Sequence, residues 1–281
     1  MSFDLKELIN DESRFFTLPE LAMKINAIVN DPEGTFEDLA EVISSDVGLS
    51  VHLLKIVNSG LYNFHEPIET ITHAISIVGM SQLRDLALGS IIINKFKGLP
   101  EESISMKSFW EHSIATGIAS QTLAIYKQEI NPERFYMAGL LHEIGRIVLC
   151  FKFHTEIEKI IQRCASETKS THNIEREILG FDHCLVGEAL LESWKLPKSQ
   201  QEVVLYHHAP LESKEYRVEA SIVHFGDIFA HILCLGNSGE HYTPPISIHA
   251  WNKLGIPIAM IPTILGRVEE RYNDLISNYF Y

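Results

Sequence analysis

Cysteine is scarce in this chain of 281 residues, and the cysteines that occur form no Cys-x-x-Cys pair and no zinc-ribbon spacing. Three of them sit in apolar periodic runs, where a free thiol behaves as a small apolar side chain. This usage indicates a reducing compartment, where thiols persist unpaired. The four positions are Cys150, Cys164, Cys184 and Cys234.

Long apolar runs are also missing. No stretch reaches the roughly 18 consecutive apolar residues of a membrane span, so the sequence predicts none. The first residues, MSFDLKELINDESRF, lack a basic segment followed by an apolar one, so we expect no signal peptide. Together with the cysteines, these absences predict a cytoplasmic protein.

Positive charge is in deficit, because the formal net charge is −14. A sequence-independent hold on DNA or RNA needs clustered lysine and arginine, so a nucleic-acid-binding regulator is the least favoured function. An anionic membrane surface is disfavoured for the same reason. A phosphate-bearing small molecule or nucleotide would need a cation or a local basic pocket to offset the field.

Signals for β-structure are absent as well: there is no strict apolar–polar alternation, no Asn-Gly or Asp-Gly turn and no fixed repeat. Helical periodicity runs through almost every segment, and 46% apolar residues suffice for a packed core. We therefore predict an all-α fold. Gly98-Leu99-Pro100 is the expected boundary between an N-terminal helical lobe, residues 1–98, and a larger lobe, residues 99–281.

Helix boundaries follow from local capping signals. Thr35 with Asp38 predicts a capping box, and Gly48 is expected to break the helix after it. Pro67 is expected to open a further helix, and Ser81 to cap the one that follows.

Two other boundaries bear on possible contacts between the lobes and on the chemistry. Asn58 and Ser59 are interpreted as a helix end, with Gly60 as a left-handed cap. Asn131 is expected to be the N-cap of a single helix that carries His142 and Glu143.

The segment FYMAGLLHEIGRIVLC, residues 135–150, is apolar except for His142-Glu143 and Arg146. Burying a neutral polar group without a partner costs about 2–7 kcal/mol, and burying a charge costs more. The partner of the pair is a metal ion, a hydrogen-bond network or one another. Candidate further ligands occur elsewhere in the chain, namely His112, His183, His207, His208 and Asp227.

Imidazole and carboxylate groups together suit a divalent metal: Zn, Fe, Mn or Ni, and Mg where several oxygens join. A single helix cannot surround an ion, so further ligands must come from other helices. The candidates meet this condition, because they lie on separate helices or helix ends.

The segment GLLHEIGRIVL resembles the LLHDIG signature of the HD superfamily of metal-dependent phosphohydrolases. The chain resembles more closely, over about residues 15–235, the HDOD domains of bacterial signalling proteins. The motifs that carry this resemblance follow in the family order: LPELAMKINAIV, DLAEVISSDVGLSVHLLKIVNSGLYNF, IETITHAISIVGMSQLRDLAL, FWEHSIATG, GFDHCLVGEALLESWKLP and VLYHHAP.

The resemblance implies an all-helical fold and a set of metal ligands. His112 corresponds to the first histidine, His142 with Glu143 to the His-Asp pair, and Asp227 to the late aspartate. Two-metal relatives of the HD-GYP type, which cleave cyclic di-GMP, add histidines at the positions of His183 and of His207 or His208.

Three departures from the enzymes concern catalysis more than metal binding. Glu143 replaces their Asp, and Arg146 replaces a Lys, which removes a proton donor of adjustable pKa. Ala-Pro follows His208, where the GYP segment is missing. The catalytic residues stay open, and Glu143 and Arg146 are the candidates if the chain is an enzyme.

HDOD domains are usually regarded as non-catalytic regulatory modules. The favoured expectation is accordingly a signal-transduction output module that acts by contact with a signalling protein. The alternative is a metal-dependent phosphohydrolase with a nucleotide or cyclic-dinucleotide substrate.

Each of these residues also has an ordinary structural interpretation. His142 and Glu143 would fit a closed polar network, and a salt bridge to a nearby acid is the favoured role of Arg146. His112 would fit a buried histidine bonded to a carboxylate, and His183 the first turn of a capped helix.

The later residues have ordinary interpretations too. The side chains of His207 and His208 should point about 100° apart on a helix, so we do not expect both to face one ion. Asp227 is flanked at helical spacing by His224 and His231, and a surface His–Asp–His face remains open.

Overall fold

The computed structural model describes residues 8–9, 15–59, 62, 64, 66–98, 104–167, 169–240 and 242–280, with side chains up to 276. Every regular element in these ranges is a helix, so the all-α prediction is confirmed. Within the same ranges, no helix combines the length and apolar character that crossing a membrane requires. The expected cap at Gly60 and the boundary residues 99 and 100 lie outside the described residues.

The chain divides into two compact units. The larger contains the described residues of Met1–Thr17 and Leu99–Leu265, and the smaller those of Leu18–Gly98 and Gly266–Tyr281. The expected lobes, residues 1–98 and 99–281, stay a prediction.

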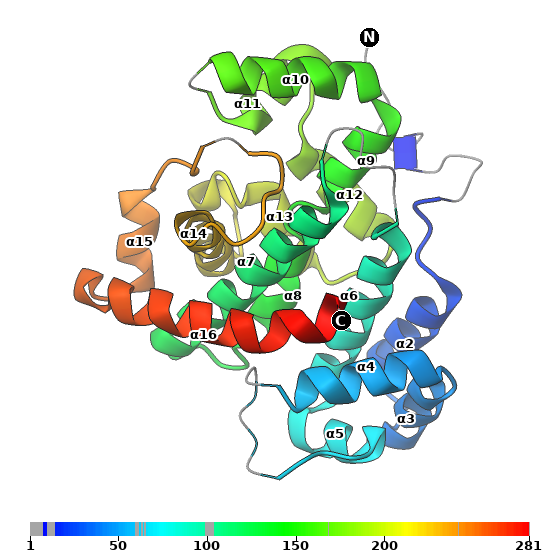
Figure 1. The fold of residues 1–281 in the computed structure, drawn as a ribbon. Helices are drawn as coiled ribbons and strands as arrows, with labels where there is room; N and C mark the ends of the chain where they lie inside the picture. Colours follow the sequence, from blue (N-terminus) through cyan, green and yellow to red (C-terminus); the bar gives the residue numbers. More distant parts are fainter. Residues whose placement is uncertain are drawn as a thin grey trace. The chain divides into compact units, whose positions relative to one another are not determined.

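In the smaller unit, four helices pack against α6, which is buried along most of its length. Figure 1 shows these helices in blue to teal. They are α2 (Glu20–Asn30), α3 (Phe36–Ser44), α4 (Val47–Val57), α5 (Ile71–Val78) and α6 (Met80–Phe96).

Capping explains where the early helices begin and end. The predicted box is present, because Thr35 accepts a bond from the Asp38 N–H and the Asp38 carboxylate accepts one from Thr35. The expected break at Gly48 is wrong, since Asp46 already caps α4 and Gly48 lies inside it. Asn58 ends α4, as predicted.

Two expected helix starts are shifted. Thr70, not Pro67, caps α5 through the His73 N–H. Gly79, not Ser81, separates α5 from α6, with a φ of 90° that glycine adopts without penalty. The left-handed turn therefore lets α6 start at once after α5.

In the larger unit, α7 is buried almost all round and packs against α8 and α14. Helices α9, α12 and α13 form a second group, with α12 against the other two. The α-helices are α7 (Met106–Lys127), α8 (Arg134–Leu141), α9 (Ile144–Lys152), α10 (His154–Ser166), α11 (Thr171–Leu179), α12 (His183–Ser193), α13 (Lys198–Tyr206), α14 (Arg217–Ile232) and α15 (Ile248–Leu254). Two short 3₁₀ turns, η1 (Pro210–Glu212) and η2 (Ile258–Met260), and α16 (Ile261–Phe280) complete the described elements.

The segment that carries the His–Glu pair is not one helix. α8 ends at Leu141, α9 begins at Ile144, and His142 and Glu143 form the turn between them. The expected N-cap at Asn131 is wrong too, because its φ is 53° and α8 begins only at Arg134. The reorientation at the pair brings α9 against α12.

Candidate metal centre

Asp227 on α14 is the point where three imidazoles meet. Its Oδ1 lies 3.1 Å from His112 Nε2 on α7 and 3.4 Å from His231 Nε2, one turn further along α14. The Nε2 of His142, after α8, lies 3.7 Å from the same oxygen. Asp227 is buried, so the open alternative of a surface His–Asp–His face is wrong.

Backbone carbonyls fix the tautomers of two of the histidines. His142 Nδ1 lies 2.7 Å from Gly139 O, and His207 Nδ1 lies 2.7 Å from Val204 O. A carbonyl only accepts, so each Nδ1 carries the proton and each Nε2 presents a lone pair. Both Nε2 atoms are buried without a hydrogen-bond partner. An imidazole held this way is typical of metal ligands.

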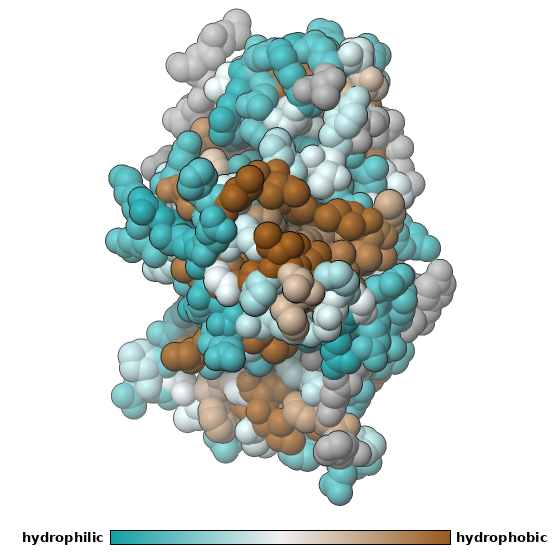
Figure 2. Space-filling view, turned by 90° about the vertical axis from the view of Figure 1, so that its left-hand side faces the viewer, coloured by the Kyte–Doolittle hydropathy of each residue, from teal (hydrophilic) through white to brown (hydrophobic). Residues whose placement is uncertain are grey.

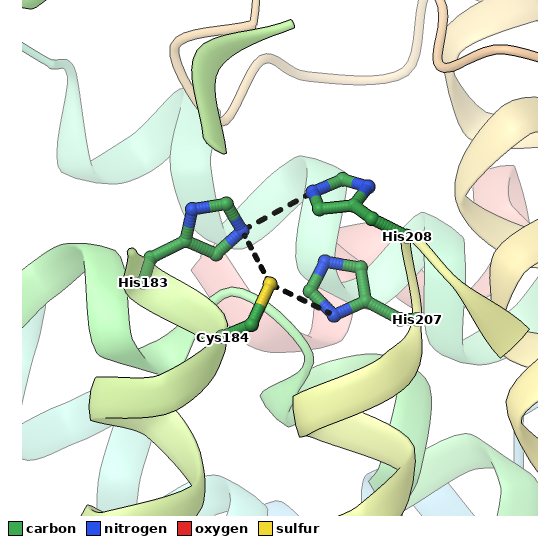
Figure 3. Close-up of side chains that lie close together, drawn as sticks. All are labelled: His183, Cys184, His207 and His208. Carbon is green, nitrogen blue, oxygen red and sulfur yellow. Dashed lines mark hydrogen bonds between the residues drawn. The ribbon is translucent and has the colours of Figure 1, made fainter. Parts of the chain in front are cut away.

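A second group of side chains adjoins the first through His207. Figure 3 shows His183 and Cys184, from the start of α12, turned toward His207 and His208. The His207 and His208 ring centroids are 4.0 Å apart. Both residues follow the last residue of α13, and the expectation that the two do not both face one ion stays a prediction.

Helix α11 orients His183. The carboxylate of Glu175 accepts from His183 Nδ1 at 2.6 Å and from its backbone N–H at 2.9 Å. His183 Nε2 is thereby left as an acceptor, and it lies 3.2 Å from His208 Nε2.

Arg146 closes the centre from the side of α9. Its Nε lies 2.9 Å from Glu143 Oε2, which confirms the predicted salt bridge. The guanidinium also donates to Ser238 O at 3.1 Å and lies 3.4 Å from Glu240 Oε1. In Figure 1 the orange segment that precedes α15, to which Ser238 and Glu240 belong, arches over α14.

Burial and neighbouring charges set the protonation of the centre. Burial raises the pKa of Glu143 to about 7, although Arg146 and His142 oppose the shift. Burial would also raise the pKa of Asp227, but the surrounding histidines lower it well below its usual range. The pKa of His112 falls to about 4, because burial outweighs the attraction of Asp227.

Three further histidines have lowered pKa values, whereas for His142 the effect of burial is outweighed by Asp227 and Glu143, which raise its pKa. Burial lowers the pKa of His183, His207 and His208 well below the usual value. Metal ligands must be unprotonated, so these rings and the Asp227 carboxylate fit a divalent cation. The donor set of nitrogen and oxygen atoms suits Fe, Mn, Zn or Ni.

Four contributing residues were not among the candidate site residues proposed from the sequence. Glu175 had a readable signal, since it shares the buried face of α11 with Thr171 and Ile174. His231 and Glu240 had weaker sequence signals. His231 follows Asp227 at helical spacing, whereas Glu240 lies in a loop without periodicity. The fourth residue is Cys184.

Comparison with known proteins agrees with the fold. The HDOD domain model matches residues 15–210, a range that ends before α14 and Asp227. A Treponema pallidum protein named "Uncharacterized protein" is 26% identical over 219 residues, or 77% of this chain. The alignment covers 42% of that protein, so the chain spans less than half of its length.

Solved structures show the same architecture. An HDOD domain protein from Geobacter sulfurreducens superposes with a TM-score of 0.72 and 24% identity, over 90% of this chain and 92% of that one. A Shewanella amazonensis protein, provisionally named a phosphohydrolase, gives 0.76 and 20%, over 98% and 97%. A Marinobacter aquaeolei protein, provisionally named for signal transduction, gives 0.73 and 20%, over 93% and 58%.

Proposed function

Because this chain belongs to the HDOD domain family, we propose that it is a bacterial signal-transduction output module. It acts by contact with a signalling protein and carries a buried metal centre of the HD type. The observation that carries this proposal is the closure of the centre, since His112, His142, Glu143 and Asp227 are at most 1% exposed. A hydrolase needs its metal and nucleophile open to substrate and water.

The state of Glu143 supports the same proposal. Its carboxylate is engaged by Arg146 at 2.9 Å and by the Ser238 hydroxyl at 3.4 Å. An arginine holds a permanent positive charge and supplies no proton of adjustable pKa. The guanidinium and the Ser238 hydroxyl therefore hold the Glu143 carboxyl in one orientation beside the centre.

The metal would be held by His112, His142, His207 and Asp227. These side chains come from α7, α14 and the ends of α8 and α13. A bound divalent cation would tie four segments together and stabilise the larger unit, because binding free energy is folding free energy.

A protein partner is supported by the apolar surface. Figure 2 shows apolar side chains gathered on the face that corresponds to the left-hand side of Figure 1, where α15 lies. Around α15, Ile246, Ile248 and Ile258 are more than 60% exposed. Large exposed apolar patches mark interaction sites.

The test combines metal analysis with hydrolysis assays. The full chain, purified and loaded with Mn, Fe or Zn, is offered cyclic di-GMP and nucleotides, and its metal content is measured. We expect bound metal but turnover far below about 1 s⁻¹, the lower end of typical enzymes. Turnover at ordinary enzymatic rates would refute the regulatory proposal.

The alternative, a metal-dependent phosphohydrolase, has one observation in its favour. His142 Nε2 and His207 Nε2 both present buried, unpartnered lone pairs beside acidic groups. A metal held there would polarise a phosphoryl oxygen and lower the pKa of bound water. A protein without bound metal, and without thermal stabilisation by added Mn, Fe or Zn, would rule this function out.

A further inference from the structure

Residues 235–240, which we name the strap, follow α14 and belong to the orange segment that arches over this helix in Figure 1. The strap is anchored to α7 beside a candidate metal ligand. The Asn237 N–H donates to Ser108 O at 2.9 Å, and a Cβ on Gly236 would collide with the backbone N of His112. Gly236 has a φ of 68°, so this close approach depends on glycine. The strap therefore lies directly against the backbone that carries His112.

The strap also occupies the outer edge of the Arg146 guanidinium. Arg146 Nη1 donates to Ser238 O at 3.1 Å, and Nη2 lies 3.4 Å from Glu240 Oε1. The third nitrogen, Nε, lies 2.9 Å from Glu143 Oε2. Each guanidinium nitrogen thus faces an acceptor, and two of these acceptors belong to the strap. Arg146 on α9 is therefore the second anchor of the strap.

The strap has little apolar surface of its own that would keep it in place. Its buried side chains are those of Ser238 and Glu240, whereas Asn237 is exposed and Leu235 is partly buried. Its internal turn is polar as well, since the Gly239 N–H donates to Asn237 Oδ1 at 2.6 Å. Segments with few buried apolar contacts open at a lower free energy than packed helices. The closed position of the strap therefore depends on its polar and charged contacts.

The closed position of Glu240 has an electrostatic cost. Burial raises the pKa of its carboxyl although Arg146 opposes the shift, and Asp227 raises the pKa further. Arg146 is shared with two other acids, because Glu143 lies 2.9 Å and Glu175 lies 4.0 Å from its Nε. One arginine therefore faces three buried carboxylates. Burying a charge without a full partner is unfavourable, so the strap closes against this cost.

The neighbouring imidazoles do not supply the missing positive charge. Ligand atoms of His172, His208 and Glu240 all lie within 4.8 Å of one another. Burial lowers the pKa of both rings, so they are uncharged at neutral pH. A divalent cation at Asp227 would supply positive charge, because it would offset the carboxylate that repels Glu240. The free energy of closing the strap should therefore depend on whether the metal centre is occupied.

We infer that the strap is a conformational switch whose closure over Arg146 is coupled to occupancy of the metal centre. A bound cation favours the buried position of Glu240 and keeps the strap closed, and loss of the cation lets the strap open. Such coupling is reciprocal, so a closed strap also tightens cation binding. The inference rests on the proposed metal centre and adds the element through which metal occupancy changes the surface of the module.

Amide hydrogen exchange of the chelator-treated full chain, followed by NMR with and without Zn²⁺, tests the inference. The Asn237 and Gly239 amides donate to Ser108 O and to Asn237 Oδ1. We expect them to exchange about 5–150-fold more slowly with Zn²⁺, the usual range of coupling between two sites. The Lys195 and Leu196 amides, bonded in the turn that ends α12, are the internal control and should exchange at the same rate in both states.

Matched variants separate the charge of Glu240 from the structure of the strap. Glu240→Gln keeps the size of the side chain without its charge, so it should abolish the zinc-dependent difference and weaken Zn²⁺ binding. Asn237→Ala removes the acceptor of the Gly239 N–H, so it should speed exchange equally in both states and preserve the difference. Glu202→Gln neutralises another buried carboxylate of the larger unit, bonded to Ser213 at 2.9 Å. It should leave the exchange difference and the Zn²⁺ affinity unchanged.

The outcomes distinguish the strap from the metal centre. Elemental analysis of each sample reports bound zinc independently of exchange, and the wild-type comparison does not depend on the folding of any variant. Zinc that binds without slowing exchange in the strap would overturn the coupling and leave the metal centre intact. A Glu240→Gln variant that keeps the full difference would overturn it too. A wild-type chain that binds no zinc would overturn the metal centre and the coupling together.

Discussion

At the scale of single residues, the atoms that are free to bind a metal are those that do not already make a hydrogen bond. Gly139 O and Val204 O accept hydrogen bonds from the Nδ1–H groups of His142 and His207, so the Nε2 atoms of these rings are acceptors. Asp227 stays ionised because the surrounding histidines lower its pKa well below the usual range. The chemistry therefore depends on backbone carbonyls as much as on ligand identity.

Replacing Asp227 with Asn should lower the affinity for Mn, Fe or Zn by more than about 10-fold, because loss of an outer partner alone costs about that much and Asp227 is a proposed ligand. The amide cannot balance the charge of a cation held by His112, His142 and His207. Isothermal titration of chelator-treated protein measures the change.

The matched control is Asp85→Asn, which removes a buried acid paired with Arg84 at 2.8 Å in the smaller unit. It should leave metal affinity unchanged, even where stability falls. Equal affinities for the wild type and Asp227→Asn would contradict the role of Asp227.

Replacing Arg146 with Met should destabilise the protein by about 3–5 kcal/mol, because it leaves buried carboxylates without their partner. Those carboxylates are Glu143, Glu175 and Glu240. Urea unfolding at neutral pH measures the loss.

Arg163→Met is the control for this prediction, since Arg163 pairs with Glu167 and Glu177 in a more exposed network. Surface pairs are screened by solvent, so its unfolding midpoint should move little. An equal loss of stability in both variants would contradict a structural role for the ion pairs of Arg146 with Glu143, Glu175 and Glu240.

At the scale of elements, the turn between α8 and α9 matters more than either helix. Gly145 is the second residue of α9, where α9 meets α12. A Cβ at this position would collide with His183 O and lie 2.5 Å from Gly187 N. The close backbone approach therefore places Glu143 and His183 together, with 3.5 Å between carboxylate oxygen and ring nitrogen.

Gly145→Ala should destabilise the protein by about 1–3 kcal/mol through overpacking, and it should weaken metal binding by displacing His183. Thermal unfolding and metal titration of the same sample measure the two effects together.

Gly266→Ala is the matched control, because Gly266 lies exposed in α16 with no atom within 4 Å of an added Cβ. Alanine should stabilise a helix there by about 0.4–1 kcal/mol. If Gly145→Ala left both the thermal stability and the metal affinity unchanged, the close approach of α9 and α12 would not be needed for either.

At the scale of the whole molecule, the formal net charge of the chain is −14, and its buried histidines among the described residues all lie in the larger unit. Its field attracts cations and repels phosphates in general. A bound metal would therefore complement the charge of the molecule as well as its local donors.

Metal should raise the stability of the full chain. At a free metal concentration of 100 times the dissociation constant, the gain is about 2.7 kcal/mol. The midpoint of thermal unfolding, measured with added Zn or Mn and again after chelation, reports this gain. Coincident midpoints with and without metal would contradict a metal centre in the folded chain.

Much of the fold was predictable from local patterns. The all-α class, the Thr35 capping box and the end of α4 at Asn58 each depend on residues a few positions apart. Errors such as Pro67 and Ser81 arose where two capping signals competed within one short segment. The candidate ligands were predictable by residue type, because few side chains bind metal.

The sequence by itself determined the helical class and the inventory of imidazoles and acids, since periodicity and side-chain chemistry are local properties. Only the tertiary structure decided which atoms meet. Arg146 reaches Glu240 across 94 positions, and Cys184 joins three histidines because α12 begins beside the end of α13. Such contacts depend on how helices pack, and packing is set by the whole chain at once.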